Sequence, residues 1–343
     1  MTRRIGWGAV CLLAIASALA PLPRAWVERW YSIGLYPHIE RLVTSTSNLV
    51  PFALFDLLWV LAIAALGVAI SRASTFGWMR GTVRITVTLL RGAAAAYLLF
   101  LALWGLNYRR IPMFDKVRFD PKRVTSAANA ALGDWAVTEL NADYAAAHAA
   151  PISVDRLRDA FEVTLRALGG TFIVPGRPKP TLLGWYFHEA AIAGMTDPFL
   201  LETMLAPDLL EVEKPFVITH EWAHLAGYAD ESEANFIAYI ACRRGDAAAR
   251  YSAALMMIGY AKSPRLAKPP WAPGALALGP RIDLFAIHRR YAQTSVTLRF
   301  AAKETYDKYL KANRVQRGIE SYDDVIQLIL GSEFDASGNP RLR

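Results

Sequence analysis

The segment EKPFVITHEWAHLAGYADESEANFIAYIAC, residues 213–242, indicates how the second half of this chain folds. Pro215 suits the first turn of a helix and Gly227 suits the position just after its C-terminal end. A helix of about three turns is therefore predicted over Phe216–Ala226, with the pentad HEWAH inside it. The acidic stretch after the glycine predicts the start of a second helix.

The pentad HEWAH carries the residue types of a catalytic zinc site. His220 and His224 are four residues apart, so both side chains lie on one face of the helix and can bind a single Zn²⁺ ion. Glu221 then lies beside the ion, where a carboxylate can act as general base toward zinc-activated water. The pentad predicts a zinc metallohydrolase, with peptide bonds as the expected substrate.

A catalytic zinc ion usually has three protein ligands, and three acids compete for the third position. Asp230 as N-cap and Glu233 three residues later form a capping-box pattern, which would occupy both side chains. Glu231 is then the free acid, with Asn235 one turn later to support a ligand by a hydrogen bond. Glu231 is the preferred ligand, while Glu233 stays an alternative. Asp230 is a second alternative ligand, because HEWAHLAGYAD fits the pattern in which a ligand follows an HxxG turn.

The first third of the chain is apolar enough to enter a membrane. The chain has 343 residues, of which 54% are hydrophobic and 20% charged, and its mean hydropathy is +0.22. Three apolar runs, Ile5–Leu22, Val50–Ile70 and Ile85–Leu106, are each near the ~20 residues that cross a bilayer as a helix. The chain is expected to divide into a three-helix membrane region, residues 1–108, and a soluble domain, residues 109–343. Trp26, Trp30, Tyr31 and Tyr36, between the first two runs, are typical of an interfacial aromatic belt.

The net charge of +8 suits anionic lipid headgroups, because the arginines gather around the apolar runs and no nucleic-acid-binding signature is present. Arginines before the first run and between the second and third favour a soluble domain outside the cytoplasm. The basic residues that follow the third run favour the opposite sidedness, and these are Arg109, Arg110, Lys116, Arg118, Lys122 and Arg123. Cys11 and Cys242 are too few and too distant for a disulfide framework, so a metal site must use histidines and carboxylates.

The soluble domain is expected to be α+β and rich in helix. Helices are predicted over Ala127–Ala149, Val154–Leu168, Ile282–Ala312 and Asp323–Leu330, strands within Thr171–Met204, and a loop over Ser263–Pro280.

The segment HEWAHLAGYADESEANF resembles the zinc-site stretch of a family of uncharacterised bacterial multi-span membrane proteins, which is placed among the gluzincin-like zinc metallopeptidases. VERWYSIGLYPHIERL, PFALFDLLW, LWGLNYRR, IAGMTDPF and YDKYLKANRVQRGIESYDDVIQLIL are also similar to segments of this family, so the resemblance covers most of residues 27–331. It implies membrane helices in the bacterial inner membrane followed by a zincin-like domain. ESEAN resembles the ExxAN element that supplies the metal-binding glutamate, here Glu231, although only six residues separate it from His224.

In zincin folds a strand beside the catalytic helix binds extended substrate, and Ile192–Leu201 is the candidate here. A further donor must stabilise the transition state, and the candidates are Tyr228, Tyr251, His288 and Tyr306. The remaining histidines, His38, His148, His188 and otherwise His288, are expected to be surface or core residues.

The expected function is hydrolysis of a peptide or protein close to the lipid bilayer, with no nucleic-acid partner. A zinc-binding membrane sensor or scaffold without turnover is the first alternative. An interaction protein whose histidine pair serves only in packing is the second.

Overall fold

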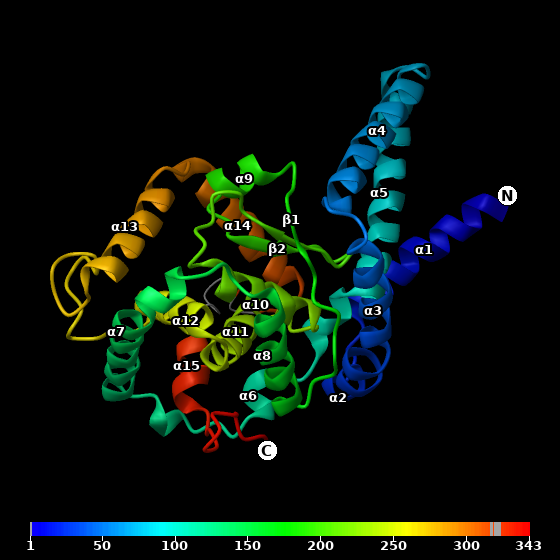
Figure 1. The fold of residues 1–343 in the computed structure, drawn as a ribbon. Coiled ribbons are helices and arrows are strands. Elements are labelled where there is room, and N and C mark those ends of the chain that lie inside the picture. The colour runs from blue at the N-terminus through cyan, green and yellow to red at the C-terminus, as the bar shows by residue number, and fades with distance from the viewer. Residues whose placement is uncertain (1, 316–317, 319–323) are drawn as a thin grey trace.

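The computed structural model describes residues 2–315, 318 and 324–343, and it is mainly helical (Figure 1). The N-terminal elements are α1 (Thr2–Leu19), α2 (Arg24–Trp26), the π-helix η1 (Val27–Leu35), α3 (Tyr36–Ser47), α4 (Leu54–Ser74), α5 (Trp78–Leu103), and the 3₁₀-helix η2 (Gly105–Arg109). They are followed by α6 (Met113–Lys116), the 3₁₀-helix η3 (Pro121–Arg123), α7 (Ser126–His148), α8 (Val154–Ala167), β1 (Pro178–Lys179), α9 (Gly184–Glu189), β2 (Gly194–Thr196) and β3 (Thr203–Leu205). The remaining elements are α10 (Lys214–Leu225), α11 (Glu231–Arg244), α12 (Ala247–Tyr260), α13 (Leu278–Ala292), α14 (Val296–Ala312) and α15 (Asp324–Gly331).

The globular body is built around α10, α11 and α12, with α7, α8 and α15 around them (Figure 1). Residues 231–242 of α11 are all buried, which is what a helix at the centre of a domain requires. The predicted helices over Ala127–Ala149 and Val154–Leu168 are confirmed as α7 and α8. Each begins at a hydroxyl cap, because Thr125 accepts a hydrogen bond from the backbone of the first turn of α7 and Ser153 does the same for α8.

A small sheet lies beside α10, with strand order β1-β3-β2. β1 pairs with β3 in parallel, and β2 pairs with β3 in antiparallel register, with Met195 opposite Met204. The prediction of strands within Thr171–Met204 is confirmed only in part. The strands are two or three residues long, and the short helix α9 interrupts the same stretch.

The predicted helical segment over Ile282–Ala312 is helical except for a short break, which divides it into α13 and α14. The break has a local cause: Ser295 accepts a hydrogen bond from the amide of Leu298 at 3.3 Å and so starts α14 as its N-cap. The predicted loop over Ser263–Pro280 is confirmed up to the start of α13 at Leu278. The predicted C-terminal helix corresponds to α15, and its expected first residue, Asp323, lies outside the described residues.

Two helices, α4 and α5, are long and apolar enough to span a membrane. They form a hairpin that projects away from the body (Figure 1). Most of their side chains are exposed, since only 6% and 11% of the most apolar windows are buried. Gly6–Leu19 of α1 is long and apolar enough to span a membrane only when it is taken together with Arg24–Ser47. These two helical stretches meet at a bend of 111°.

The base of α4 is anchored to the small sheet by a buried ion pair. Lys179 on β1 lies 2.6 Å from Glu202, whose carboxylate accepts hydrogen bonds from the amides of Leu54 and Phe55 at 3.1 and 2.9 Å. These amides belong to the unsatisfied donors at a helix N-terminus, so the carboxylate caps α4. Asp56 in the first turn of α4 accepts a hydrogen bond from the hydroxyl of Thr181 at 2.7 Å. The expected division at residue 108 stays a prediction, and side chains from both sides of it share one hydrophobic core.

Candidate metal centre

Helices α10 and α11 and the turn between them hold the candidate site. Gly227 adopts a φ of +79°, and a Cβ atom there would lie 2.8 Å from the Asn107 side chain, so only glycine fits this turn. Trp222 fixes α10 from its opposite face: it is fully buried, donates to the carbonyl of Gly176 at 2.9 Å and packs edge-on against Phe161 at 5.6 Å. Replacing such a tryptophan with alanine typically costs about 3–5 kcal/mol.

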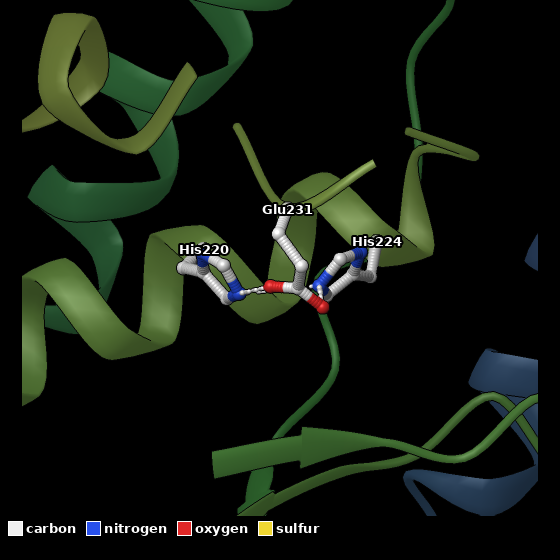
Figure 2. A group of neighbouring side chains, drawn as sticks. All are labelled: His220, His224 and Glu231. Carbon is white, nitrogen blue, oxygen red and sulfur yellow. Dashed lines mark hydrogen bonds and ion pairs between the residues drawn. The ribbon is translucent and has the colours of Figure 1, made fainter. Parts of the chain in front are cut away.

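The structure brings His220, His224 and Glu231 together (Figure 2). Nε2 of His220 lies 3.1 Å from Nε2 of His224 and 3.2 Å from Oε2 of Glu231, and Nε2 of His224 lies 3.6 Å from Oε1 of Glu231. The side chains are nearly buried, with exposed fractions of 14%, 10% and 4% in the same order. Two imidazole nitrogens and one carboxylate group therefore meet between the two helices, with one ligand atom of each residue within 4.8 Å of the others.

The far side of each imidazole ring is held by an oxygen. Nδ1 of His220 lies 2.9 Å from Oδ1 of Asn235, and Nδ1 of His224 lies 2.8 Å from the backbone carbonyl of Tyr228. A carbonyl only accepts, so His224 carries its proton on Nδ1 and, when neutral, presents the lone pair of Nε2 toward the cluster. This arrangement is typical of histidines that bind metals. The expected support of a ligand by Asn235 is thus seen at His220.

The electrostatics of the cluster favour a charged carboxylate. Burial alone raises the pKa of Glu231, but the two imidazoles more than offset it and hold the pKa well below its ordinary value. Burial disfavours the charged form of His224 and so lowers its pKa, but the negative charge of Glu231 outweighs burial and raises the pKa to about 9. Without a metal ion, the cluster holds protons that an incoming cation must displace.

Glu221 lies beside the three donors on α10 and contacts the sheet. The hydroxyl of Thr196 on β2 donates to Oε2 of Glu221 at 2.8 Å, and a Cβ atom on Gly194 would approach Oε1 of Glu221 to 2.7 Å. The backbone of β2 therefore passes so close to this carboxylate that a side chain at position 194 would require the Glu221 carboxylate and Val217 to shift. Burial raises the pKa of Glu221, partly offset by His220 and His224, as is usual for a general base that must hold a proton during a reaction.

The two other acids considered as third ligand make different contacts. Asp230 is the N-cap of α11 and accepts hydrogen bonds from the amides of Ser232 and Glu233 at 2.9 and 3.4 Å. Glu233 accepts a hydrogen bond from the amide of Met113 at 2.6 Å. The predicted capping box is therefore only half formed, because the Glu233 side chain satisfies a distant amide. Among the described residues, Glu231 alone of the three acids joins the histidines.

The four candidates for a transition-state donor differ in the groups that their side chains contact. The hydroxyl of Tyr306 on α14 donates to Oε1 of Glu231. Tyr228 packs under Arg110 with its ring 4.1 Å from the guanidinium, Tyr251 donates to Asp283 at 2.5 Å, and the His288 ring stacks on Trp271 at 4.2 Å. Among the described residues, Tyr306 is the only one of the four whose side chain contacts the three-residue cluster, because Tyr228 contacts His224 through its backbone carbonyl.

The other histidines expected at the surface or in the core all lie outside the cluster. His38 lies 3.0 Å from the guanidinium of Arg41, His148 lies 3.2 Å from Asp283, and His188 lies 2.7 Å from Asp208.

Two contacts of the site have no signal in the sequence. Trp104 at the end of α5 donates from its indole nitrogen to the carbonyl of His224 at 2.9 Å, and Thr196 on β2 binds Glu221. Both contacts join segments that are far apart in the chain, so helical spacing around the HEWAH pentad carries no information about them.

Comparison with known families places this chain. The family model DUF3810, described as a protein of unknown function, matches residues 31–330. The chain belongs to the DUF3810 family. The match covers the body and the α4–α5 hairpin and begins after α1. No curated protein and no solved structure matches the chain.

Proposed function

We propose that this DUF3810 protein is a membrane-anchored zinc metallohydrolase that cleaves peptide bonds, with a C-terminal domain of the gluzincin type. One observation carries the proposal: the donor atoms of His220, His224 and Glu231 lie within 4.8 Å of one another, with the Glu221 carboxylate adjacent on the same helix. Two imidazoles and one carboxylate are a ligand set of catalytic zinc sites, which keep a further position open for water.

The distances within the cluster suit this ion. Ligand atoms about 2.0–2.2 Å from a tetrahedral zinc ion lie roughly 3.3–3.6 Å from one another. The two Nε2 atoms lie 3.1 Å apart, and each faces one oxygen of the Glu231 carboxylate, Oε2 at 3.2 Å from His220 and Oε1 at 3.6 Å from His224, so the separations are close to these values. The rings need little movement to bind, because their Nδ1 atoms are already hydrogen-bonded to oxygens.

The roles of the surrounding residues follow from their contacts. A bound zinc ion would lower the pKa of a coordinated water to about 7. Glu221 is the general base, and the Thr196 hydroxyl orients its carboxylate. The Tyr306 hydroxyl donates to Glu231, and when it turns its one proton toward the substrate it is the proposed donor to charge that develops on the carbonyl oxygen.

An extended peptide is the substrate class that the small sheet favours. β2 pairs with β3 alone among the described strands, so its other edge is free of strand partners there. The same strand contacts Glu221 through Thr196. A peptide that pairs with this edge would therefore run past the proposed base. This is the segment within Ile192–Leu201 that the resemblance to zincins suggests.

The membrane region of the proposal consists of three spans, in which α1 and the following helical stretch form the first and α4 and α5 form the others. The location is the bacterial inner membrane, with the body outside the cytoplasm. The α4–α5 hairpin supports an integral membrane protein, because its apolar side chains are exposed along both helices.

Zinc analysis of the purified full-length protein tests the metal and its ligands together. We expect about one equivalent of zinc in the wild type and in Glu233→Gln, and loss of zinc in His220→Ala and Glu231→Gln. Glu233→Gln is the matched control, because its side-chain oxygen can still accept from Met113 while the position stays outside the cluster. A wild-type protein without zinc, or a Glu231→Gln variant with full zinc content, would overturn the proposed site.

Hydrolysis is tested separately with a library of quenched fluorescent peptides. Glu221→Gln should keep its zinc and lose about 10²–10⁴-fold in the rate of cleavage. If Glu221→Gln cleaved as fast as the wild type, the role of the base would be refuted. Tight zinc binding without peptide cleavage by the wild type or by Glu221→Gln would favour the alternative function, a zinc-binding membrane sensor or scaffold.

A further inference from the structure

A cavity of about 340 Å³ lies where the end of α1 meets the body. Its lining consists of Leu22, Tyr108 and three arginines, Arg24, Arg109 and Arg314. The arginines come from distant parts of the chain: the start of α2, the end of η2 and the segment after α14. The cavity does not include any of the candidate metal ligands.

Arg109 is buried in this wall with part of its hydrogen-bonding capacity unused. Its exposed fraction is 8%, and its Nη2 atom donates to the carbonyl of Ser17 at 2.8 Å. Its Nη1 atom is buried and has no hydrogen-bond partner within the part of the chain that the structure describes. A buried donor without an acceptor costs free energy, so a ligand that supplies an acceptor there would be favoured.

Among the described residues, two of the three arginines of the cavity have no carboxylate partner. Arg314 donates to the carbonyls of Ala18 and Ala20 at 2.8 and 3.1 Å, and within residues 2–315, 318 and 324–343 neither Arg109 nor Arg314 forms an ion pair with a carboxylate. Burial lowers the pKa of Arg109, and the positive charge of Arg314 lowers it further. The ion pair between Arg24 and Asp115 is long, 4.0 Å, and both side chains are more than half exposed. An anion is the ligand that such a wall attracts.

The position of the cavity indicates which anion. It lies at the bend of 111° between Gly6–Leu19, which is apolar, and Arg24–Ser47. Just beyond the bend, Trp26 and Trp30 are 49% and 57% exposed, as is typical of tryptophans at the level of lipid headgroups. A phosphate held here would lie beside the apolar helix, where the acyl chains of its lipid have a surface to contact.

We propose that this cavity binds the phosphate of an anionic lipid headgroup. Guanidinium groups recognise phosphate oxygens through paired, charge-assisted hydrogen bonds, and the volume is at the lower end of that found for small-ligand sites. The carbonyls at the end of α1 hold Arg109 and Arg314 in place, so the cationic wall is already formed before the lipid arrives. The lipid then fixes the angle at which α1 leaves the membrane surface.

The proposal is tested with the full-length protein in neutral detergent, by measuring lipid binding with native mass spectrometry and the Tm with added lipid. Phosphatidylglycerol should bind at least about tenfold more tightly than phosphatidylcholine with the same acyl chains, and of these two lipids only phosphatidylglycerol should raise the Tm. Inorganic phosphate should give a much smaller rise, because it lacks the acyl chains. A rise of equal size with inorganic phosphate would overturn the assignment to a lipid.

Two variants connect the binding to the cavity. Arg24→Gln removes an exposed cation that has a long ion pair with Asp115, and Arg314→Gln removes the cation that donates to the carbonyl of Ala18. Each substitution should weaken phosphatidylglycerol binding about tenfold. Arg166→Gln is the matched control, because Arg166 is similarly exposed, at 71%, but lies on α8. Unchanged lipid binding in Arg24→Gln would overturn the proposal. The proposal would also fail if a peptide with a free C-terminal carboxylate displaced the lipid while its amide did not. The zinc-free His220→Ala variant should bind the lipid normally, which separates this proposal from that of the metal centre.

Discussion

Replacing Asn235 with alanine tests whether the orientation of His220 supports metal binding. Oδ1 of Asn235 lies 2.9 Å from Nδ1 of His220, and Asn235 is buried, with an exposed fraction of 4%. The alanine variant loses this acceptor, so the ring can rotate and its Nδ1 proton is left without a partner in a nearly buried position. Loss of such support typically weakens metal binding about 10–100-fold, which corresponds to roughly 1.4–2.8 kcal/mol.

The assay is competition for zinc between the purified protein and a chromogenic chelator, at constant pH. Asn235→Asp should bind zinc as tightly as the wild type or more tightly, because a carboxylate still accepts from Nδ1 and makes the imidazole a stronger ligand. Asn141→Ala is the control: Oδ1 of this asparagine accepts from the amide of Ala277 and its Nδ2 donates to the carbonyl of Ala275, but it lies on α7. If Asn235→Ala and Asn141→Ala bound zinc with the wild-type affinity, the reasoning about ring orientation would be refuted.

Two further predictions concern the base and the protons of the cluster. Gly194→Ala should displace the Glu221 carboxylate and slow peptide cleavage about 100-fold while zinc content stays normal, whereas Gly259→Ala, where a Cβ meets no atom within 4 Å, should be as active as the wild type. Equal activity of the two variants would contradict the tight approach of β2. Glu231 raises the pKa of His224 to about 9 in the metal-free protein, so zinc must displace a proton below that pH. The apparent zinc affinity should therefore rise about tenfold per pH unit between pH 6 and 8, as chelator competition would show, and a flat profile would be inconsistent with a protonated His224.

Local patterns in the sequence predict the helices that carry the site. Pro215 and Gly227 mark a helix whose bounds in the structure are Lys214–Leu225, and Asp230 caps the next helix as its spacing indicates. These predictions depend on interactions within three or four residues, which is the range over which helical geometry and capping act. The prediction over Ile282–Ala312 misses only the break between two helices, where the hydroxyl cap at Ser295 starts α14 inside an otherwise helical pattern.

Contacts between distant segments are beyond such patterns. The spacing of Glu233 predicts a completed capping box, but its side chain accepts from the amide of Met113, which is 120 residues away in the chain. Tyr306 is one of four equal candidates in the sequence, and only the packing of α14 brings its hydroxyl to Glu231. A buried polar group takes whichever partner the fold supplies, because the cost of leaving it unpaired exceeds a local preference.

The sequence by itself determined that two imidazoles and an acid lie on one helix, because a spacing of four residues places side chains on the same face whatever surrounds them. It also determined that α4 and α5 are long and apolar enough to cross a bilayer, since that depends only on composition and length. The tertiary structure alone decided that Glu231 faces the two histidines, that β2 lies against Glu221, and that three arginines from separate segments line one cavity. The physical reason is that these contacts depend on how the helices and the sheet pack, and packing is set by the whole core and not by neighbours in the chain.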